Sequence, residues 1–387
     1  MTEKLYWDNA YRTKFTAKVK LIYEEGVILD KTLFYPESGN QASDVGNLKI
    51  KDEKFNVIKV TKDKNYIIHH ISSEFKSKIN IGDVVEGKID WDNRNGIMKA
   101  HSSQHIFSAI IKNKYNIETN RAIINYEDVF LQISQEIDYD QLSEILTEVN
   151  KIYTTNNLKV NATIISYKEA EEISKKIRSV IANESQVRLI EIEGLDLVCC
   201  GGTHVKNSTE IGPIFIYDFK KGTDIRYVIG NKALEMYFKT NSDLIELANE
   251  INTPLNKFKE LLKKRLKFFE NLQEKHKELS YKLLSSISKA AVKKIDDISL
   301  FYIDFDIDIK ILNKSLDNFP SNSLIIVQFE DNKIRILSPN EKIDSNKIMQ
   351  ELIRKFSGKG GGNSKSAQGF LKKMPENLLS EIELLLN

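Results

Sequence analysis

The sequence predicts an α+β protein made of several units, and three observations support this. The 387 residues are too many for one ordinary domain. Short strand-like patterns dominate up to about residue 90, whereas strand and helix patterns alternate beyond it. A long stretch with helical spacing then precedes a second alternating region. We therefore expect a β-barrel-like domain, a mixed α+β domain, a helical arm and a C-terminal α/β domain, over 1–90, 91–240, 241–295 and 296–387.

The first ninety residues have the pattern of a small, partly closed sheet or barrel. Polar and apolar residues alternate from Phe15 to Tyr23, which is typical of a half-buried strand. Glycines separate the apolar runs and mark turns between them. The further strands expected here are Val27–Phe34, Phe55–Val60, Tyr66–Ile71 and Val84–Ile89.

The pattern changes at Trp91. Asp92–Lys112 places its apolar residues at helical spacing, and helices are also expected near Tyr139–Tyr153 and Lys168–Lys176. Strands are expected between and after them, near Val129–Ile133, Val160–Ile165, Val187–Ile192 and Ile214–Phe219. This alternation indicates a mixed α+β core.

Two helices should follow. The first covers Asn231–Asn249, and Thr253 and Pro254 suit the N-cap and first helical position of the second. Apolar residues from Leu255 to Leu283 fall on an a/d spacing, which predicts an amphipathic helix of roughly 50 Å. The helix could pack as a hairpin on its own neighbours or serve as an oligomerisation arm.

The C-terminal region has an α/β pattern. Strands are expected at Leu300–Ile303, Leu324–Gln328 and Ile334–Leu337, then a glycine-rich loop and a closing helix near Pro375–Leu386.

Composition excludes several classes of protein. Hydrophobic residues make up 41% and charged residues 29%, which is normal for a soluble chain. The N-terminus lacks the apolar run of a signal peptide, and no stretch is long and apolar enough for a membrane span. The two cysteines are adjacent, which excludes a disulfide framework and favours a cytoplasmic protein. Because the net charge is only +2, a nucleic-acid surface would have to be a local patch.

Two short motifs predict one zinc site. His101 and His105 lie four apart on an expected helix, so both imidazoles can reach one ion. Cys200 and His204 lie four apart across a Gly-Gly turn that lets their side chains converge. One thiolate with imidazoles suits zinc better than magnesium or calcium. The CGGTH spacing favours Cys200 as the ligand, and Cys199 should pack inward.

These motifs resemble the editing domain of alanyl-tRNA synthetase and its free-standing relatives, the AlaX proteins. The HSSQH and CCGGTHV segments carry the likeness, together with FYPESGNQ at 34–41, DIRY at 224–227 and the glycine-rich SGKGGG at 357–362. Ser38 and Asn40 depart from the family's glycines in the first loop, and Asn tolerates a left-handed backbone. Asn363-Ser364-Lys365 departs from the usual residues after the triple glycine.

The resemblance extends over nearly the full chain, as in the long form of AlaX. It implies a zinc-binding editing domain over 91–240 and a DHHA1-like C-terminal module over 296–387. The implied partner is tRNA(Ala) mischarged with serine, or with glycine, whose ester the protein hydrolyses. Zinc could lower the pKa of a bound water and polarise the ester carbonyl. Four protein ligands, however, are more typical of a structural zinc, so the ion must expand its coordination or hold one ligand loosely.

Serine could be selected through its hydroxyl, because a site built to bind that hydroxyl rejects a substrate lacking it. Gln104 and Thr203 are candidates for reading it, and Gln41 joins them as a catalytic candidate by resemblance. Asp44 and Arg226 are substrate-binding candidates on the same ground. Gln41, Asp44 and Arg226 each have a plainer interpretation as ordinary turn or strand residues.

The RNA contacts are expected nearer the C-terminus. From Leu255 to Lys294 there are twelve Lys/Arg and four acidic residues, an excess typical of a phosphate-binding surface. The glycine-rich loop could place backbone N–H groups against phosphates, but it lacks a P-loop ending, so ATP binding is not expected. The RNA-binding candidates are Lys263, Lys264, Arg265, Lys359, Gly360, Gly361 and Gly362. A homodimer could form through the arm or the C-terminal domain.

Three other functions compete with this interpretation. A zinc metalloprotease would need Glu directly after the first histidine, where Ser102 stands. A non-catalytic tRNA-binding protein with a structural zinc and a D-aminoacyl-tRNA deacylase both remain compatible with the motifs.

Overall fold

The computed structural model describes residues 1–71, 78–179, 185–339 and 343–386. The chain forms two compact units, Met1–Leu247 and Ala248–Asn387. Among the described residues, no helix has the length and apolar character that crossing a membrane requires.

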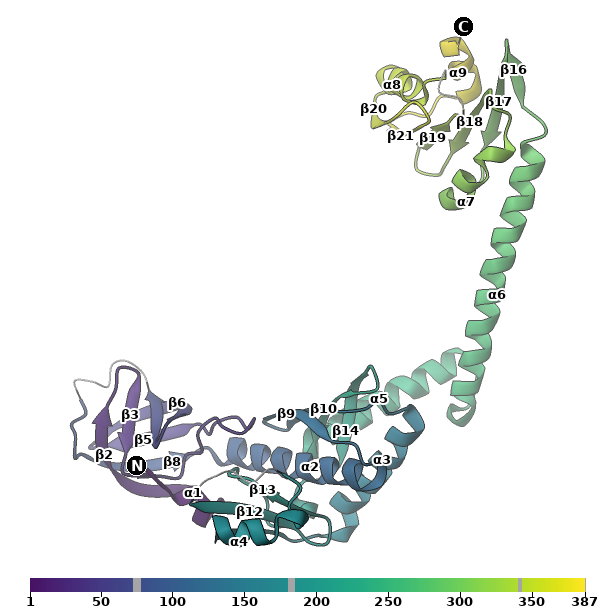
Figure 1. The fold of residues 1–387 in the computed structure, drawn as a ribbon. Coiled ribbons are helices and arrows are strands. Elements are labelled where there is room, and N and C mark those ends of the chain that lie inside the picture. The colour runs from purple at the N-terminus through teal and green to yellow at the C-terminus, as the bar shows by residue number, and fades with distance from the viewer. Residues whose placement is uncertain (72–77, 180–184, 340–342, 387) are drawn as a thin grey trace. The chain divides into compact units, whose positions relative to one another are not determined.

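The first unit begins with a closed six-stranded barrel (Figure 1). The alternating pattern of Lys14–Ile22 places every second side chain in the barrel core. Around the barrel the strands run in the order β2 (Lys14–Ile22), β3 (Gly26–Leu29), β7 (Tyr66–Ile71), β6 (Glu53–Asp63), β5 (Gly46–Ile50) and β8 (Val84–Ile89). The expected barrel is present, and β5 is a strand that the sequence pattern missed because only Leu48 and Ile50 of it are buried.

The expected strand Val27–Phe34 is wrong in its second half. Strand β3 stops at Leu29, because the Asp30 carboxylate accepts hydrogen bonds from the backbone N–H groups of Lys18 and Lys31. A separate short strand β4 (Lys31–Thr32) then pairs in parallel with β1 (Glu3–Lys4), which leads into α1 (Leu5–Asp8).

The mixed part of this unit is organised around helix α2 (Trp91–Tyr115). The Asp90 side chain caps its first turn, and Asn116 ends it in a left-handed conformation. Helix α2 contacts strands of two sheets (Figure 1). Apolar side chains are therefore buried on several of its sides. One sheet has the order β14 (Ile214–Lys220), β15 (Asp224–Ile229), β10 (Asp128–Ile133), β9 (Thr119–Asn125); the other has β11 (Val160–Ser166), β12 (Gln186–Ile192), β13 (Asp196–Cys199).

The remaining helices of this unit lie close to their expected places. They are α3 (Tyr139–Lys151), which continues into a π-helical turn at Ile152–Asn156, α4 (Tyr167–Glu172) and α5 (Gly230–Glu250). Strands β9, β13 and β15 were not expected from the sequence; β13 is only four residues long.

The second unit contains the long helix α6 (Leu255–Ile287). The expected cap at Thr253 is wrong: Pro254 holds the cap position in an extended conformation, and among the described residues no side chain caps the helix. Most of the apolar side chains of α6 are exposed, Phe268 by 68% and Leu266 by 55%, and only Leu284 is buried along this fully described helix. Within the second unit, few apolar side chains of α6 are therefore packed.

A six-stranded sheet forms the rest of the second unit (Figure 1). Its order is β16 (Lys293–Ile295), β17 (Ile298–Ile303), β18 (Ser323–Gln328), β19 (Lys333–Leu337), β21 (Ser366–Leu371) and β20 (Gly358–Gly362). The accompanying helices are α7 (Ile309–Lys314), α8 (Ser345–Phe356) and α9 (Leu378–Leu386).

The glycine-rich segment is a strand, not the expected loop. Gly358, Gly360 and Gly362 face the backbone of β21 so closely that an added Cβ would lie 2.0–2.3 Å from its carbonyl oxygens. Glycine here permits close pairing, although its rarity in strands makes such a run look like a loop.

Candidate metal centre

The four predicted ligands meet in the core of the first unit. His101 and His105 come from consecutive turns of α2, and Cys200 and His204 from the turn that follows β13. Their ligand atoms all lie within 4.8 Å of one another. The Cys200 Sγ is 3.4 Å from Nε2 of His101 and 3.3 Å from Nε2 of His204. Two segments about a hundred residues apart thus converge on one point.

The three backbone carbonyls of the Cys200–Gly202 turn are held by two distant side chains. Arg188, on β12, donates from one Nη1 to the carbonyl oxygens of Cys200 and Gly202, at 2.8 and 2.9 Å. The indole N–H of Trp7 donates to the carbonyl oxygen of Gly201 at 2.9 Å. Sequence reasoning missed both residues, since nothing local links them to the CGGTH motif. They fix the turn that presents Cys200.

Glycine is required at position 202 because the side chains of His101 and Gln41 lie too close for a Cβ atom. An added Cβ would lie 2.3 Å from Cε1 of His101 and 2.5 Å from Oε1 of Gln41. Gly202 is not among the described glycines with positive φ. Of the two glycines in the expected turn, Gly202 is therefore the one that makes room for the His101 ring.

The Nδ1 atoms of the three clustered histidines have different surroundings. The Nδ1 of His101 lies 2.7 Å from Oε1 of Gln41, and the Nδ1 of His204 lies 3.1 Å from the Ser102 hydroxyl. The Nδ1 of His105 has no hydrogen-bond partner in the described part of the chain, and the nearest carboxylate, Asp196, is 4.0 Å away. Such outer contacts orient imidazoles that bind metals.

The charge states fit a cation-binding site. Burial lowers the pKa of His101 to about 3 and also lowers the pKa of His105 and His204, so the imidazoles are neutral. Burial raises the pKa of the Cys200 thiol to about 11. Zinc binds neutral imidazole and thiolate and favours loss of that thiol proton. Three buried neutral imidazoles and one thiol are a donor set that fits zinc.

Gln41 and Thr203 adjoin this cluster, whereas Gln104 does not face it. Gln41 is buried: its Oε1 accepts from the Thr203 N–H at 3.1 Å and its Nε2 donates to the Thr203 hydroxyl at 3.0 Å. Gln104 donates to the Ser108 hydroxyl, further along α2. Cys199 packs against a small apolar cluster and is not part of the ligand group.

Asp44 and Arg226 lie apart from the ligands. Asp44 is fully buried and receives two hydrogen bonds from the Arg94 guanidinium, which reaches it from α2. Arg226 is exposed, with its guanidinium 4.6 Å from the Phe130 ring. Its neighbour Tyr227 instead points inward and contacts Ser103. The structure does not bring either candidate to the metal cluster.

The RNA-binding candidates lie in the second unit. Lys263, Lys264 and Arg265 are exposed on α6, where Lys264 pairs with Glu260. Lys359 and Gly360 line a pocket of about 350 Å³ that Arg335 and the half-exposed Phe370 share. This gives the C-terminal sheet a surface with both cationic and aromatic groups.

Two family descriptions match separate parts of the chain. Residues 7–93 match "tRNA synthetases class II (A)", and residues 187–227 match "Threonyl and Alanyl tRNA synthetase second additional domain". The second match contains the Cys200–His204 turn.

A curated relative extends the match along the whole chain. The alanyl-tRNA editing protein AlaX-L of Pyrococcus horikoshii is 29% identical over 98% of this chain and 96% of its own length. The resemblance to the AlaX family is confirmed. Beside AlaX-L, the alanine–tRNA ligase of Methanococcus maripaludis is 29% identical over 100% of this chain but 44% of the ligase. The chain thus spans less than half of that ligase.

Among solved structures, the C-Ala domain of Aquifex aeolicus alanyl-tRNA synthetase covers 24% of this chain and 92% of its own, at TM-score 0.20 and 21% identity.

Proposed function

We propose that this protein is a cytoplasmic hydrolase that removes serine from mischarged tRNA(Ala), with glycine as a second candidate amino acid. The observation that supports it most is the buried His101–His105–Cys200–His204 cluster, in a chain similar along its length to AlaX-L. One zinc ion is the cofactor of this proposal. A buried, neutral donor set has no evident use without a cation.

When bound, zinc supplies Lewis-acid chemistry, acidifying water and polarising an ester carbonyl. The protein's own residues organise the site around it. Gln41 fixes the ring of His101 and the position of Thr203 through three hydrogen bonds. The Thr203 hydroxyl accepts one of these bonds and keeps its own proton to donate. We therefore place Thr203 and Gln41 beside the serine hydroxyl.

The other three candidates have supporting roles in this proposal. Gln104 stiffens α2 through Ser108. Asp44 ties the 34–46 loop to α2 through Arg94, since its carboxylate also accepts from the Tyr35 N–H. Arg226 is exposed, so a substrate that extends over the surface of the first unit can contact it.

The second unit is proposed to hold the RNA. Its supporting features are the basic stretch of α6 and the pocket beside Lys359 on the C-terminal sheet. The exposed apolar side chains of α6 also support a homodimer through this helix.

Two other functions make different predictions. A four-ligand zinc is more often structural, which favours a non-catalytic tRNA-binding protein. A D-aminoacyl-tRNA deacylase would use the same motifs on another substrate.

Hydrolysis assays distinguish these three functions. The zinc-loaded chain is incubated with Ser-, Gly-, Ala- and D-Ala-tRNA(Ala), beside the variants His101→Ala and His276→Ala. We expect loss of Ser-tRNA(Ala) with wild type and with His276→Ala, an exposed histidine on α6, and not with His101→Ala. Preferred loss of the D-alanyl ester would favour the deacylase. If no ester is lost faster than without protein, the hydrolase proposal is wrong.

A further inference from the structure

Exposed cations gather on the outside of four neighbouring barrel strands, β2, β8, β5 and β6. A hollow of about 410 Å³ lies there, and five cationic residues line it with a single carboxylate, that of Glu86. This is a strong local excess in a chain whose net charge is only +2. The five residues, called the cationic face below, are Arg12, Lys14, Lys49, Lys54 and Lys88.

The strand register places like charges opposite one another in the cationic face. Lys14 on β2 is the direct partner of Lys88 on β8, and Lys49 on β5 is the direct partner of Lys54 on β6. Glu86 lies opposite Lys49 from the other side. Because like charges directly opposite destabilise a sheet, the stability of the barrel does not explain these lysines. A bound anion would explain them.

The cations of this face have no anionic partner of their own. Among the described residues, none of the five forms an ion pair, although other lysines of the barrel do. Lys51 pairs with Asp83 at 3.0 Å, and Lys59 pairs with Glu37 at 2.6 Å. The charges of the cationic face are therefore available to an anion from outside the chain.

The lining of the hollow suits a phosphate backbone better than an acidic protein. Thr16 and Asn47 line it too, and such side chains donate hydrogen bonds to phosphate oxygens. Its one apolar side chain, Phe15, is only 4% exposed because it packs in the barrel core. A protein interface normally has an apolar centre, whereas contacts to nucleic-acid phosphates need only cations and hydrogen-bond donors.

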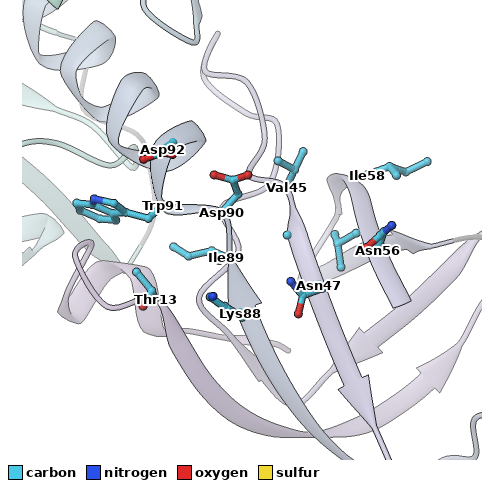
Figure 2. A pocket seen from close by; sticks show the side chains of 12 residues that line it. Thr13, Val45, Asn47, Asn56, Ile58, Lys88, Ile89, Asp90, Trp91 and Asp92 are labelled. Atoms are coloured by element: carbon cyan, nitrogen blue, oxygen red, sulfur yellow. The ribbon is translucent and has the colours of Figure 1, made fainter. Parts of the chain in front are cut away.

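A neighbouring hollow of about 650 Å³ bounds the cationic face (Figure 2). It shares Asn47 and Lys88 with the first hollow, but Asp90 and Asp92 line it as well (Figure 2). These carboxylates repel phosphate. None of the four clustered His and Cys residues lines either hollow. An anion on the cationic face is thus bound outside the metal cluster.

We propose that the cationic face binds the phosphate backbone of the RNA on which the chain acts. The identity of this RNA rests on the proposed function, because the face offers no means of reading bases. It gives the first unit an RNA contact of its own, in addition to the one proposed for α6. Backbone contacts carry no sequence information, so the face contributes affinity and not specificity.

Binding of uncharged tRNA(Ala) tests this without any reaction. The RNA is labelled at its 5′ end, and fluorescence anisotropy follows its binding to the full-length, zinc-loaded chain. The double variant Lys14→Gln, Lys88→Gln should bind at least about five-fold more weakly. Its logarithmic salt slope should be shallower by about 1.5, since each lost phosphate contact removes roughly 0.7–0.9. Urea unfolding should show a barrel at least as stable as wild type, because the repulsion between the two lysines is gone.

The matched control is Lys20→Gln, Lys64→Gln, which removes two exposed lysines of the same barrel that line neither hollow. It should bind tRNA(Ala) as wild type does. Equal weakening by both double variants would mean that only net charge matters, and it would overturn the proposal. Lower stability of Lys14→Gln, Lys88→Gln would do the same, because the lysines would then support the barrel. Polyglutamate is a second probe: if its binding, and not that of tRNA(Ala), depends on Lys14 and Lys88, the partner is an acidic protein and the proposal is wrong.

The outcome separates this proposal from the proposed hydrolysis. If tRNA(Ala) binding depends on Lys14 and Lys88 but Ser-tRNA(Ala) is stable, the cationic face binds RNA and the hydrolase proposal fails. If Ser-tRNA(Ala) is hydrolysed and tRNA(Ala) binding is unchanged in Lys14→Gln, Lys88→Gln, only the proposal for the cationic face fails.

Discussion

At Gly202, the absence of a side chain makes room for the His101 ring. Alanine there would place Cβ 2.4 Å from Nδ1 of His101 and 2.5 Å from Oε1 of Gln41. Both atoms would have to move, and the hydrogen bond that orients the His101 ring would break. Because losing such an outer contact typically costs 10–100-fold in metal affinity, we expect Gly202→Ala to weaken zinc binding by at least about ten-fold. Competition with a chromophoric chelator measures this.

The neighbouring glycine offers a matched control. A Cβ on Gly201 would meet nothing closer than the Trp7 ring at 3.8 Å, an ordinary contact. Gly201→Ala should therefore keep near wild-type zinc affinity. Equal weakening by both substitutions would mean that general damage to the turn, not the His101 contact, is responsible.

The sequence could name the four side chains that cluster but not the residues that hold them in place. Each ligand pair is local, four residues apart, so the spacing alone predicts convergence. Trp7 and Arg188 act on the Cys200 turn from 194 and 12 residues away, and Asp196 faces His105 only because β13 packs beside α2. Such contacts depend on the tertiary fold and leave no local pattern.

At the scale of elements, the barrel encloses a neutral histidine that should make its stability depend on pH. His69, on β7, contacts the Thr32 hydroxyl at 2.8 Å and the Val27 carbonyl oxygen at 3.1 Å. Burial lowers its pKa from 6.5 to about 4. The unfolded chain takes up a proton below about pH 6.5, but the folded barrel does so only near pH 4. Its contribution to stability is therefore complete above pH 6.5 and declines as the pH falls towards 4.

Through this histidine, we expect acidification from pH 7 to pH 5 to lower the free energy of unfolding by about 2 kcal/mol. His69→Gln should be less stable at pH 7 but lose less stability on acidification. Urea unfolding followed by tryptophan fluorescence measures both, since Trp7 and Trp91 lie in the first unit. The exposed His276→Gln serves as control. Parallel pH profiles for wild type and His69→Gln would contradict the prediction.

Elements with regular patterns were predicted well, and irregular ones were not. The expected Tyr66–Ile71 and Val84–Ile89 match β7 and β8, in which every second side chain is buried. Strand β20 was taken for a loop because its glycines permit backbone contact instead of providing side-chain pairs. Asp30 ended β3 through hydrogen bonds that the apolar pattern does not encode.

At the scale of the whole molecule, the metal cluster and the basic helix lie in different compact units. The four ligands belong to Met1–Leu247, and Lys263, Lys264 and Arg265 belong to Ala248–Asn387. The order of the motifs in the sequence predicted that the candidate metal ligands come before the candidate RNA-binding residues along the chain. It could not show how few apolar side chains of α6 are packed within the second unit, because an a/d spacing does not say which residues cover it.

This separation predicts that charge reversal on α6 weakens substrate binding without slowing the reaction. The triple variant Lys263→Glu, Lys264→Glu, Arg265→Glu should raise KM for Ser-tRNA(Ala) and leave kcat close to wild type. The salt dependence should also become shallower by about two in its logarithmic slope, since each lost phosphate contact removes roughly 0.7–0.9. Hydrolysis kinetics over a range of salt concentrations measure all three quantities. A seryl minihelix that lacks most of the tRNA body is the control, and the variant should process it as wild type does. If kcat falls while KM and the salt slope stay constant, α6 acts on the reaction itself and the assignment of RNA binding to this helix is wrong.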